Sequence, residues 1–223
     1  MEALEDVFTL MDKVKFGETV LIEYYHSFIP ELTTLGLLYY GRTRGLPVII
    51  DDNFDSLHVI QKHLEFVGID EDFRDALVVK TGGKRNVGNV VARVRFVSEP
   101  VIYIRNYEEA SKAAFSNVEK SINIVLGLER LFSFVPSVSE FYTFVIAFQS
   151  FLGEKRRKAF YLINKKIASS IPFNPLPELE RIANTVIEAV PTSTTGIFTF
   201  KKSTSLDLLG KKIEIPIGVI GWK

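Results

Sequence analysis

The sequence predicts an α/β protein in which a mostly parallel central sheet is flanked by helices. Short runs of β-branched and apolar residues alternate with longer segments whose apolar residues recur every three to four positions. The expected strands are apolar on both faces, which is typical of a parallel sheet covered by helices on both sides. Because 223 residues are enough to bury a core of their own, we expect one domain over residues 1–223.

The first third of the chain predicts strand, helix, strand, helix. Residues 19–23 (TVLIE) are the first strand, and Pro30 suits the first turn of a helix that extends to about residue 41. Residues 47–51 (PVIID) are the second strand. Residues 55–68 carry the apolar stripe of a second helix, with a capping residue at the start and glycine at the end.

The middle of the chain predicts two more strands and a helix before a buried fifth strand. Residues 76–80 are the third strand, and the glycine-containing residues 81–89 are turn-like. We expect a fourth strand at residues 100–105 (PVIYIR) and a helix at residues 108–118 with alanines facing inward. Residues 121–126 (SINIVL) are typical of a fully buried strand.

The last third predicts two helices, one further strand and a C-terminal antiparallel pair. Residues 139–152 are an apolar, aromatic helix, and residues 159–164 (AFYLIN) are a strand. Residues 177–188 carry apolar residues on one helical face. Residues 196–201 and 213–217 then form the antiparallel hairpin.

Composition excludes several classes of function. The absence of cysteine excludes a disulfide framework, a cysteine-ligated zinc site and a catalytic thiol. The 27 basic and 27 acidic residues give zero net charge, whereas proteins that bind nucleic-acid backbones usually carry a basic excess. The apolar runs are far shorter than the roughly 20 residues of a membrane span, and the acidic start is unlike a signal peptide. We therefore expect a cytoplasmic protein with no membrane partner.

The order of these segments resembles the core of the RecA/KaiC ATPases. Residues 16–22 (FGETVLI), a helix ending at Tyr40-Gly41 and residues 45–51 (GLPVIID) are similar to their first strand, helix and second strand. Residues 122–131 (INIVLGLERL) resemble their Walker B strand and the turn after it. The resemblance spans roughly residues 14–220 and implies a three-layer core that ends in an antiparallel hairpin. The chain also resembles an uncharacterised family of small proteins from hyperthermophilic archaea that are RecA/KaiC relatives.

The same resemblance implies that the phosphate-binding loop is lost. Aligned to the pattern G-x-x-x-x-G-K-[ST], the two glycines fall on Glu23 and Phe28, the lysine on Ile29 and the hydroxyl residue on Pro30. The Walker B acid falls on Gly127. Each missing charge-assisted phosphate contact is worth about 1.5–3 kcal/mol. We therefore expect no ordinary ATP binding, no catalytic residue, no cofactor and no metal.

A candidate ligand or partner cleft remains where the first two strands end. In an open parallel sheet, ligands sit beyond the carboxyl ends of the strands. The aromatic loop there offers contact area and hydrogen-bonding tips, or alternatively its rings fill the volume of the lost nucleotide. The two aspartates could hold Mg²⁺ or polarise water; alternatively, Asp52 or Asn53 ends the strand and Asp55 or Ser56 caps the next helix. The candidate residues are Glu23, Tyr24, Tyr25, His26, Phe28, Asp51 and Asp52.

Other polar clusters favour structural interpretations. His58 and His63 are five residues apart, so a helix places them on different faces and they make a poor metal pair. Residues 80–85 (KTGGKR) lack the context of a phosphate loop and are expected to be a mobile turn. Residues 155–158 (KRRK), with Lys165-Lys166 nearby, lack interleaved aromatic residues and are expected to be a solvated turn.

The aromatic helix is the strongest sequence signal for association. Its aromatic and aliphatic residues cover more than one helical face, so the helix is either fully buried within the chain or covered by a partner, including a second copy in a homodimer. Both alternatives stay open. The residues concerned are Phe141, Tyr142, Phe144, Val145, Phe148 and Phe151.

Three functions are compatible with these patterns. The first, which we favour, is a non-catalytic RecA/KaiC-like scaffold that acts through protein or peptide contacts. The second is a divergent enzyme or small-molecule binder that uses His26, Asp51 and Asp52 around a remodelled cleft. The third is a nucleic-acid accessory factor that uses residues 155–158 and 165–166, although the charge balance disfavours it.

Overall fold

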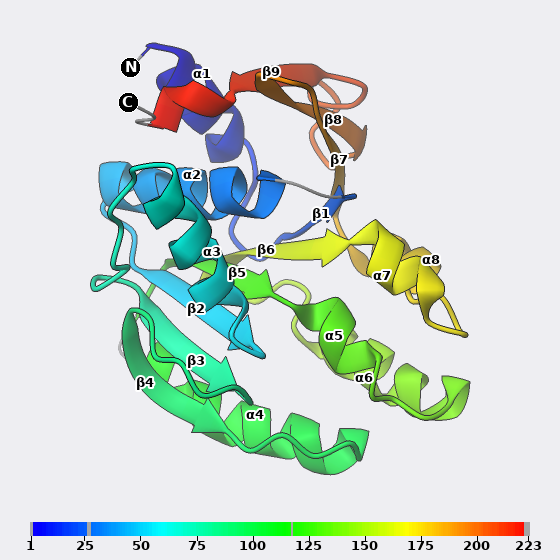
Figure 1. Ribbon diagram of the computed structural model, residues 1–223. Helices are drawn as coiled ribbons and strands as arrows, with labels where there is room; N and C mark the ends of the chain where they lie inside the picture. Colours follow the sequence, from blue (N-terminus) through cyan, green and yellow to red (C-terminus); the bar gives the residue numbers. More distant parts are fainter. Residues whose placement is uncertain (1, 26–27, 117, 221–223) are drawn as a thin grey trace.

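The strands form one nine-stranded sheet in the order β4-β3-β2-β5-β6-β1-β7-β8-β9 (Figure 1). The computed structural model describes residues 2–25, 28–116 and 118–220. The strands from β4 to β7 in this order are parallel, whereas β7, β8 and β9 pair antiparallel. The strand bounds are β1 Thr19–Tyr24, β2 Val48–Asn53, β3 Leu77–Thr81, β4 Asn89–Val94, β5 Ser121–Leu126, β6 Arg157–Asn164, β7 Thr185–Pro191, β8 Thr195–Lys202 and β9 Lys212–Pro216.

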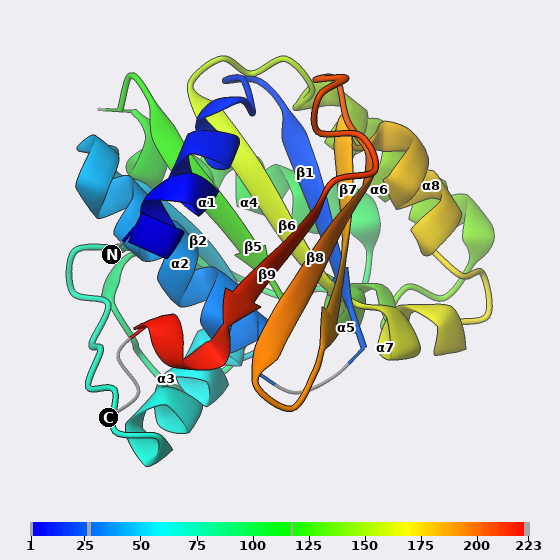
Figure 2. The ribbon, with the colours of Figure 1, turned by 90° about the horizontal axis from the view of Figure 1, so that it is seen from above.

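Helices cover both faces of the sheet and give three layers (Figures 1 and 2). One core cluster joins α1, α2 and α3 to the sheet, and a second joins α4 to α8 to the opposite face. The expected α/β class with a C-terminal antiparallel hairpin is therefore confirmed. The helix bounds are α1 Glu2–Asp12, α2 Ile29–Arg44, α3 Ser56–Phe66, α4 Pro100–Phe115, α5 Leu128–Phe132, α6 Val138–Ser150, α7 Lys165–Ser170, α8 Leu176–Ile182 and a 3-10 turn η1 Ile217–Ile220.

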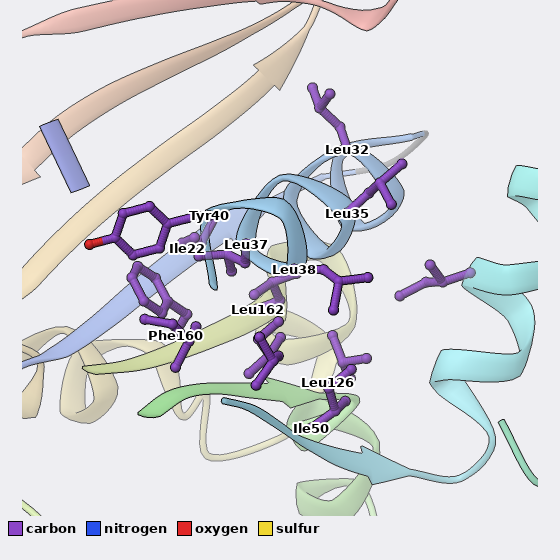
Figure 3. Close-up of a cluster of buried hydrophobic side chains, with 14 of the residues drawn as sticks. Ile22, Leu32, Leu35, Leu37, Leu38, Tyr40, Ile50, Leu126, Phe160 and Leu162 are labelled. Carbon is purple, nitrogen blue, oxygen red and sulfur yellow. The ribbon is translucent and has the colours of Figure 1, made fainter. Parts of the chain in front are cut away.

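The first core lies between α2 and the middle of the sheet. Figure 3 shows the side chains of α2 gathered above strand residues that include Phe160 and Leu162. Helix and sheet approach closely at Gly41, where a Cβ would lie 2.4 Å from Val48 Cγ2. This contact requires glycine and fixes the carboxyl end of α2 against β2, so the opposite end of α2 is held over the edge where the parallel strands end.

The second core is rich in aromatic rings. Phe132 of α5 makes edge-to-face contacts with Phe141, Phe144 and Phe148 of α6, with ring centroids 5.3 to 5.9 Å apart. Such pairs contribute roughly 0.5–1.5 kcal/mol each beyond the burial of their surface. They hold the short helix α5 in place immediately after β5.

The expected strand at residues 100–105 is wrong, because these residues begin the helix α4. Pro100 stands in the first turn, where its missing N–H costs nothing, and Val101 and Ile102 are exposed rather than inserted into a sheet. The apolar run PVIYI does not by itself distinguish a strand from a helix. The fourth strand of the parallel sheet is instead β4, which was not expected.

The expected helix at residues 177–188 is also wrong in its second half. Helix α8 ends at Ile182, and β7 begins three residues later. Leu179, Ile182 and Val186 are all buried, although the last belongs to a strand. The short helices α5 and α7 were not assigned from the sequence, because five or six residues show no helical period. The N-terminal helix α1 was not assigned either, although its apolar residues do recur at helical spacing.

The C-terminal hairpin turns away from the parallel sheet toward α1. Figure 1 shows β9 beside α1, above α2. Side chains of α1, α2, β8 and β9 line an apolar cavity of about 80 Å³ between them. Among the described residues, none of the helices is long and apolar enough to cross a membrane.

Candidate functional site

A cavity of about 350 Å³ lies beyond the carboxyl ends of β1, β5 and β6. The first turns of α2 and α5 and one face of α3 complete its walls. This is the edge at which an open parallel sheet binds ligands. The lining residues are Tyr24, Phe28, Pro30, Glu31, Ser56, Val59, Ile60, His63, Leu126, Gly127, Glu129, Arg130 and Leu162.

The amino end of α2 forms one wall and is unsuited to an anion. Phe28 has a left-handed backbone with φ of 50°, and its carbonyl oxygen accepts the Leu32 N–H at 2.9 Å. Helix amino ends attract phosphates through free N–H groups and the positive end of the dipole. Here Pro30 has no N–H, and Glu31 places a negative charge in the first turn. The negative charge of Glu31 therefore already compensates the positive end of the α2 dipole.

Glu31 is buried and contacts a histidine across the cavity wall. His63 Nδ1 of α3 lies 2.5 Å from Glu31 Oε1. The Glu31 side chain is 6% exposed, whereas that of His63 is 50% exposed. Glu31 Oε2 is buried and accepts no hydrogen bond from any residue that the structure describes. One oxygen of this buried carboxyl group is therefore without a donor among the described residues.

Glu129 is the second buried acid of the cavity. It stands in the first turn of α5, and its Oε2 also lacks a hydrogen-bond partner within the described part of the chain. Burial raises the pKa of this carboxyl to about 7. Burial raises the pKa of the Tyr24 hydroxyl most, and the negative charge of Glu129 raises it next. The positive charge of Arg130 lowers this pKa to a smaller extent, and Glu31 raises it slightly. These four groups thus act on one another at one end of the cavity.

Of the predicted cleft residues, Tyr24 and Phe28 line this cavity. His26 lies outside the described residues. Tyr25 is exposed, and the Lys165 ammonium lies 5.4 Å from the centroid of its ring. The loop therefore divides between the cavity and the surface.

Glu23 lies elsewhere. It is buried on β1, and its carboxylate pairs with Lys165 Nζ at 2.9 Å. Burial raises the pKa of Glu23 despite this pair. Lys165 also pairs with Glu188 on the neighbouring strand β7. Because side chains alternate along a strand, Glu23 and Tyr24 face opposite sides of the sheet.

Asp51 belongs to a buried polar network under α4, not to the cavity. The Tyr107 hydroxyl donates to Asp51 Oδ1 at 3.0 Å, and Asn123 Nδ2 donates to Asp51 Oδ2 at 2.7 Å. Arg157 in turn donates to Asn123 Oδ1 at 2.6 Å. Burial raises the pKa of Asp51. The network satisfies its members and leaves the carboxylate no role at the carboxyl edge.

Asp52 lies at the end of β2 and its side chain caps α3, a capping role that the sequence suggested for Asp55 or Ser56 instead. Its Oδ1 accepts the Leu57 N–H in the first turn of α3 at 2.9 Å, and its Oδ2 accepts from Lys80 Nζ at 2.7 Å. Lys80 also donates to Asp55, which accepts the N–H groups of Lys84 and Arg85. The expected mobile turn at residues 80–85 is therefore wrong at its start, because Lys80 and Thr81 are buried residues of β3. Only the residues after Thr81 form a turn, which Asp55 anchors.

The basic run at residues 155–158 is not the solvated turn that was expected. Arg157 and Lys158 are both buried on β6, and Lys158 Nζ donates to the Tyr40 hydroxyl at 2.9 Å. Two of the four charges therefore face the interior and cannot contact nucleic acid. Within the described residues, no group of three or more histidine, aspartate or glutamate side chains is arranged to hold a metal ion.

The aromatic helix divides between the two alternatives. Phe141, Phe144 and Val145 of α6 are buried, whereas Tyr142 and Ile146 are exposed. Val138 is exposed as well, one turn before Tyr142. The inward face of α6 therefore packs within the chain, and association through the outward face stays a prediction.

The sequence did not identify the polar residues that distinguish the cavity, namely Glu31, His63 and Glu129. Glu129 carries a usable signal, because it follows a buried strand by three residues and so stands at the ligand edge of the sheet. His63 carries none, because only the packing of α3 against α2 brings it to Glu31.

Solved structures with the same fold come from archaea. The chain is 27% identical to protein PH0250 from Pyrococcus horikoshii, with a TM-score of 0.76 over 92% of this chain and 96% of that one. It is 12% identical to the KaiC-like protein PH0186 from P. horikoshii, with a TM-score of 0.57 over 89% and 85%.

A third structure is protein PH0321 from P. horikoshii, solved in complex with an unknown peptide. It is 12% identical to this chain, with a TM-score of 0.58 over 89% of each chain. None of the curated proteins compared with the chain matches it.

These likenesses confirm the RecA/KaiC-like fold. The sequence also matches, over residues 9–214, the family described as "Pyrococcus protein of unknown function, DUF257". The chain therefore belongs to this Pyrococcus family of unknown function.

Proposed function

We propose that the protein is a non-catalytic binding module that holds a peptide segment of a partner protein in the cavity at the carboxyl edge of the sheet. The observation that carries this proposal is the wall formed by α2. Its first turn presents Pro30 and the buried carboxylate of Glu31 where a RecA-like ATPase presents N–H groups and a lysine to phosphate.

The electrostatics of the cavity disfavour a nucleotide. Glu31 and Glu129 are both buried in its wall, and a triphosphate placed there would add further negative charge at low dielectric. Glycines that would let backbone N–H groups converge on a phosphate are absent from residues 23–30. Loss of the phosphate loop, which the sequence suggested, is part of this proposal.

The lining suits a peptide instead. Leu126, Leu162 and Ile60 supply apolar surface, and Tyr24 and Phe28 supply aromatic surface. Ligand pockets typically combine such walls with a few polar groups that fix orientation. The peptide bound to PH0321, which shares the fold, supports this assignment.

The test compares two tryptophan substitutions on α3. Val59 is partly exposed and lines the cavity, so Val59→Trp should fill its mouth; Phe66 is 89% exposed and does not line it. Peptides selected from a displayed random library on the wild-type chain should retain affinity for Phe66→Trp and lose at least tenfold for Val59→Trp. Binding of Mg-ATP with measurable turnover, or equal peptide affinity for both variants, would contradict the proposal.

The predicted homodimer is retained for the outward face of α6, where Val138, Tyr142 and Ile146 are exposed on successive turns. Sedimentation equilibrium should show a dimer that Ile146→Glu converts to monomer. A wild-type chain that remains monomeric at every concentration would remove this prediction and leave the cavity proposal intact.

A further inference from the structure

Two buried carboxylates at one cavity each have an oxygen without a partner. Glu31 and Glu129 are 4% and 2% exposed, and neither Oε2 accepts a hydrogen bond from any residue within 2–25, 28–116 and 118–220. Burial of an ionised carboxylate is costly unless donors compensate it. Since His63 occupies only Oε1 of Glu31, the described chain supplies no donor for either second oxygen.

The acidic groups fit an organic cation better than a metal ion as the donor for these oxygens. The acidic groups near the cavity do not form a cluster of three ligands that could hold a metal, within the part of the chain that the structure describes. An ammonium or guanidinium group needs fewer carboxylates and donates hydrogen bonds directly to them.

The rest of the wall fits the stem of such a cation. Leu126 and Leu162 are apolar, and the rings of Tyr24 and Phe28 can cover an alkyl chain or lie against a positive charge. Arg130 is exposed at the rim, so its charge faces solvent while the two acids lie deeper. The cavity is thus apolar along its sides and acidic at depth.

We propose that the cavity selects peptides by a lysine or arginine side chain whose charged group binds Glu31 and Glu129. This inference rests on the proposed peptide-binding function and names the residue that the site recognises. The Glu31–His63 pair orients one carboxylate, and the first turn of α5 positions the other.

The probes are acetylated, amidated alanine pentapeptides whose central residue is lysine, arginine, norleucine or glutamate, together with the free amine cadaverine. Isothermal titration calorimetry measures their affinity for the full chain. Lysine and arginine peptides should bind at least tenfold more tightly than the norleucine peptide, which has the same stem without the charge, and the glutamate peptide should bind least.

Three variants assign the charge preference to residues. Glu129→Gln should reduce binding of the lysine peptide about ten- to hundredfold, the effect of one lost charge-assisted contact. Arg130→Gln removes a positive charge that repels the cationic peptide at the exposed rim. This variant should therefore bind the lysine peptide up to about fivefold more tightly. Glu65→Gln, an exposed acid on α3 outside the cavity, should change nothing. Because Arg130 is exposed, its variant tests the sign of the preference even if Glu129→Gln folds poorly.

The outcomes separate the two proposals. If the norleucine peptide binds as well as the lysine peptide and Val59→Trp abolishes both, the cation inference is wrong and peptide binding stands. If cadaverine binds as tightly as the lysine peptide, the cation site stands and the peptide function is wrong. If no probe binds, or if Arg130→Gln weakens the cationic peptides, both the charge preference and its assignment to this cavity are overturned.

Discussion

Gly127 stands at a position that only glycine can occupy. Its φ is 71°, and a Cβ there would lie 2.4 Å from Ser56 Oγ and 2.7 Å from the Asn53 carbonyl oxygen. The resemblance to RecA/KaiC proteins places the Walker B acid at this residue. An aspartate cannot enter without moving the turn between β2 and α3, so this packing and a Walker B acid exclude each other.

Gly127→Ala should therefore lower the free energy of unfolding by about 2–4 kcal/mol, from the backbone strain and the overlap together. Gly45→Ala is the matched control, because Gly45 has a φ of 63° but no atom within 4 Å of its Cβ position. The control should lose only about 1 kcal/mol. Urea unfolding measures the loss of stability in both variants. Equal losses would show that the overlap with Ser56 and Asn53 does not destabilise Gly127→Ala.

Glu129 makes stability depend on pH. Its pKa is about 7 in the folded chain, because of burial, against an ordinary value of 4.5. The folded state therefore binds more protons than the unfolded state between these values, and stability falls as pH rises from about 4.5 to 7. The shift corresponds to at most about 3 kcal/mol.

Glu129→Gln should reduce the loss of stability between pH 4.5 and 7 and leave the protein more stable than wild type above pH 7. Some slope should remain, because burial also raises the pKa of Glu23. Thermal melts between pH 4.5 and 8 measure the difference, with Glu65→Gln as the control. If the melting temperatures of wild type and Glu129→Gln depend on pH in the same way, burial does not raise the pKa of Glu129.

At the scale of elements, the sequence predicted the elements that lie at the centre of the sheet. Strands β1, β2, β5 and β6 are buried on both faces and were assigned within a few residues. The errors concern other segments: β4, at one edge of the sheet, is only partly buried, and the internal strand β7 follows α8 so closely that one apolar stripe runs through both. Local pattern does not separate helix from strand where a segment is short.

Lys80 and Asp52 join three elements, namely β2, β3 and the start of α3. Both side chains are at most 1% exposed, so Asp52→Ala should leave a buried charge with only Asp55 as partner and cost about 3–5 kcal/mol. Lys80→Met in the same chain should recover part of that loss. A double-mutant cycle measured by urea unfolding tests the coupling, and additive losses would contradict it.

At the scale of the whole molecule, the position of the cavity was predictable and the polar residues that line it were not. Parallel topology places ligands at the carboxyl edge, and Tyr24 and Phe28 were expected and found there. Asp51 and Asp52 were expected there too, but α4 and Lys80 hold them in the sheet. Residues from separate helices define the acidic end, and no local pattern reveals that they meet.

The central claim is that this cavity takes a peptide and not a nucleotide. Ile60, Leu126 and Leu162 are three methyl-bearing cavity residues on three different elements, so methyl NMR is a direct probe of the cavity. We predict that library-selected peptides shift these methyl signals to saturation and that Mg-ATP leaves them unchanged. Saturable shifts with Mg-ATP, and none with the peptides, would contradict the claim.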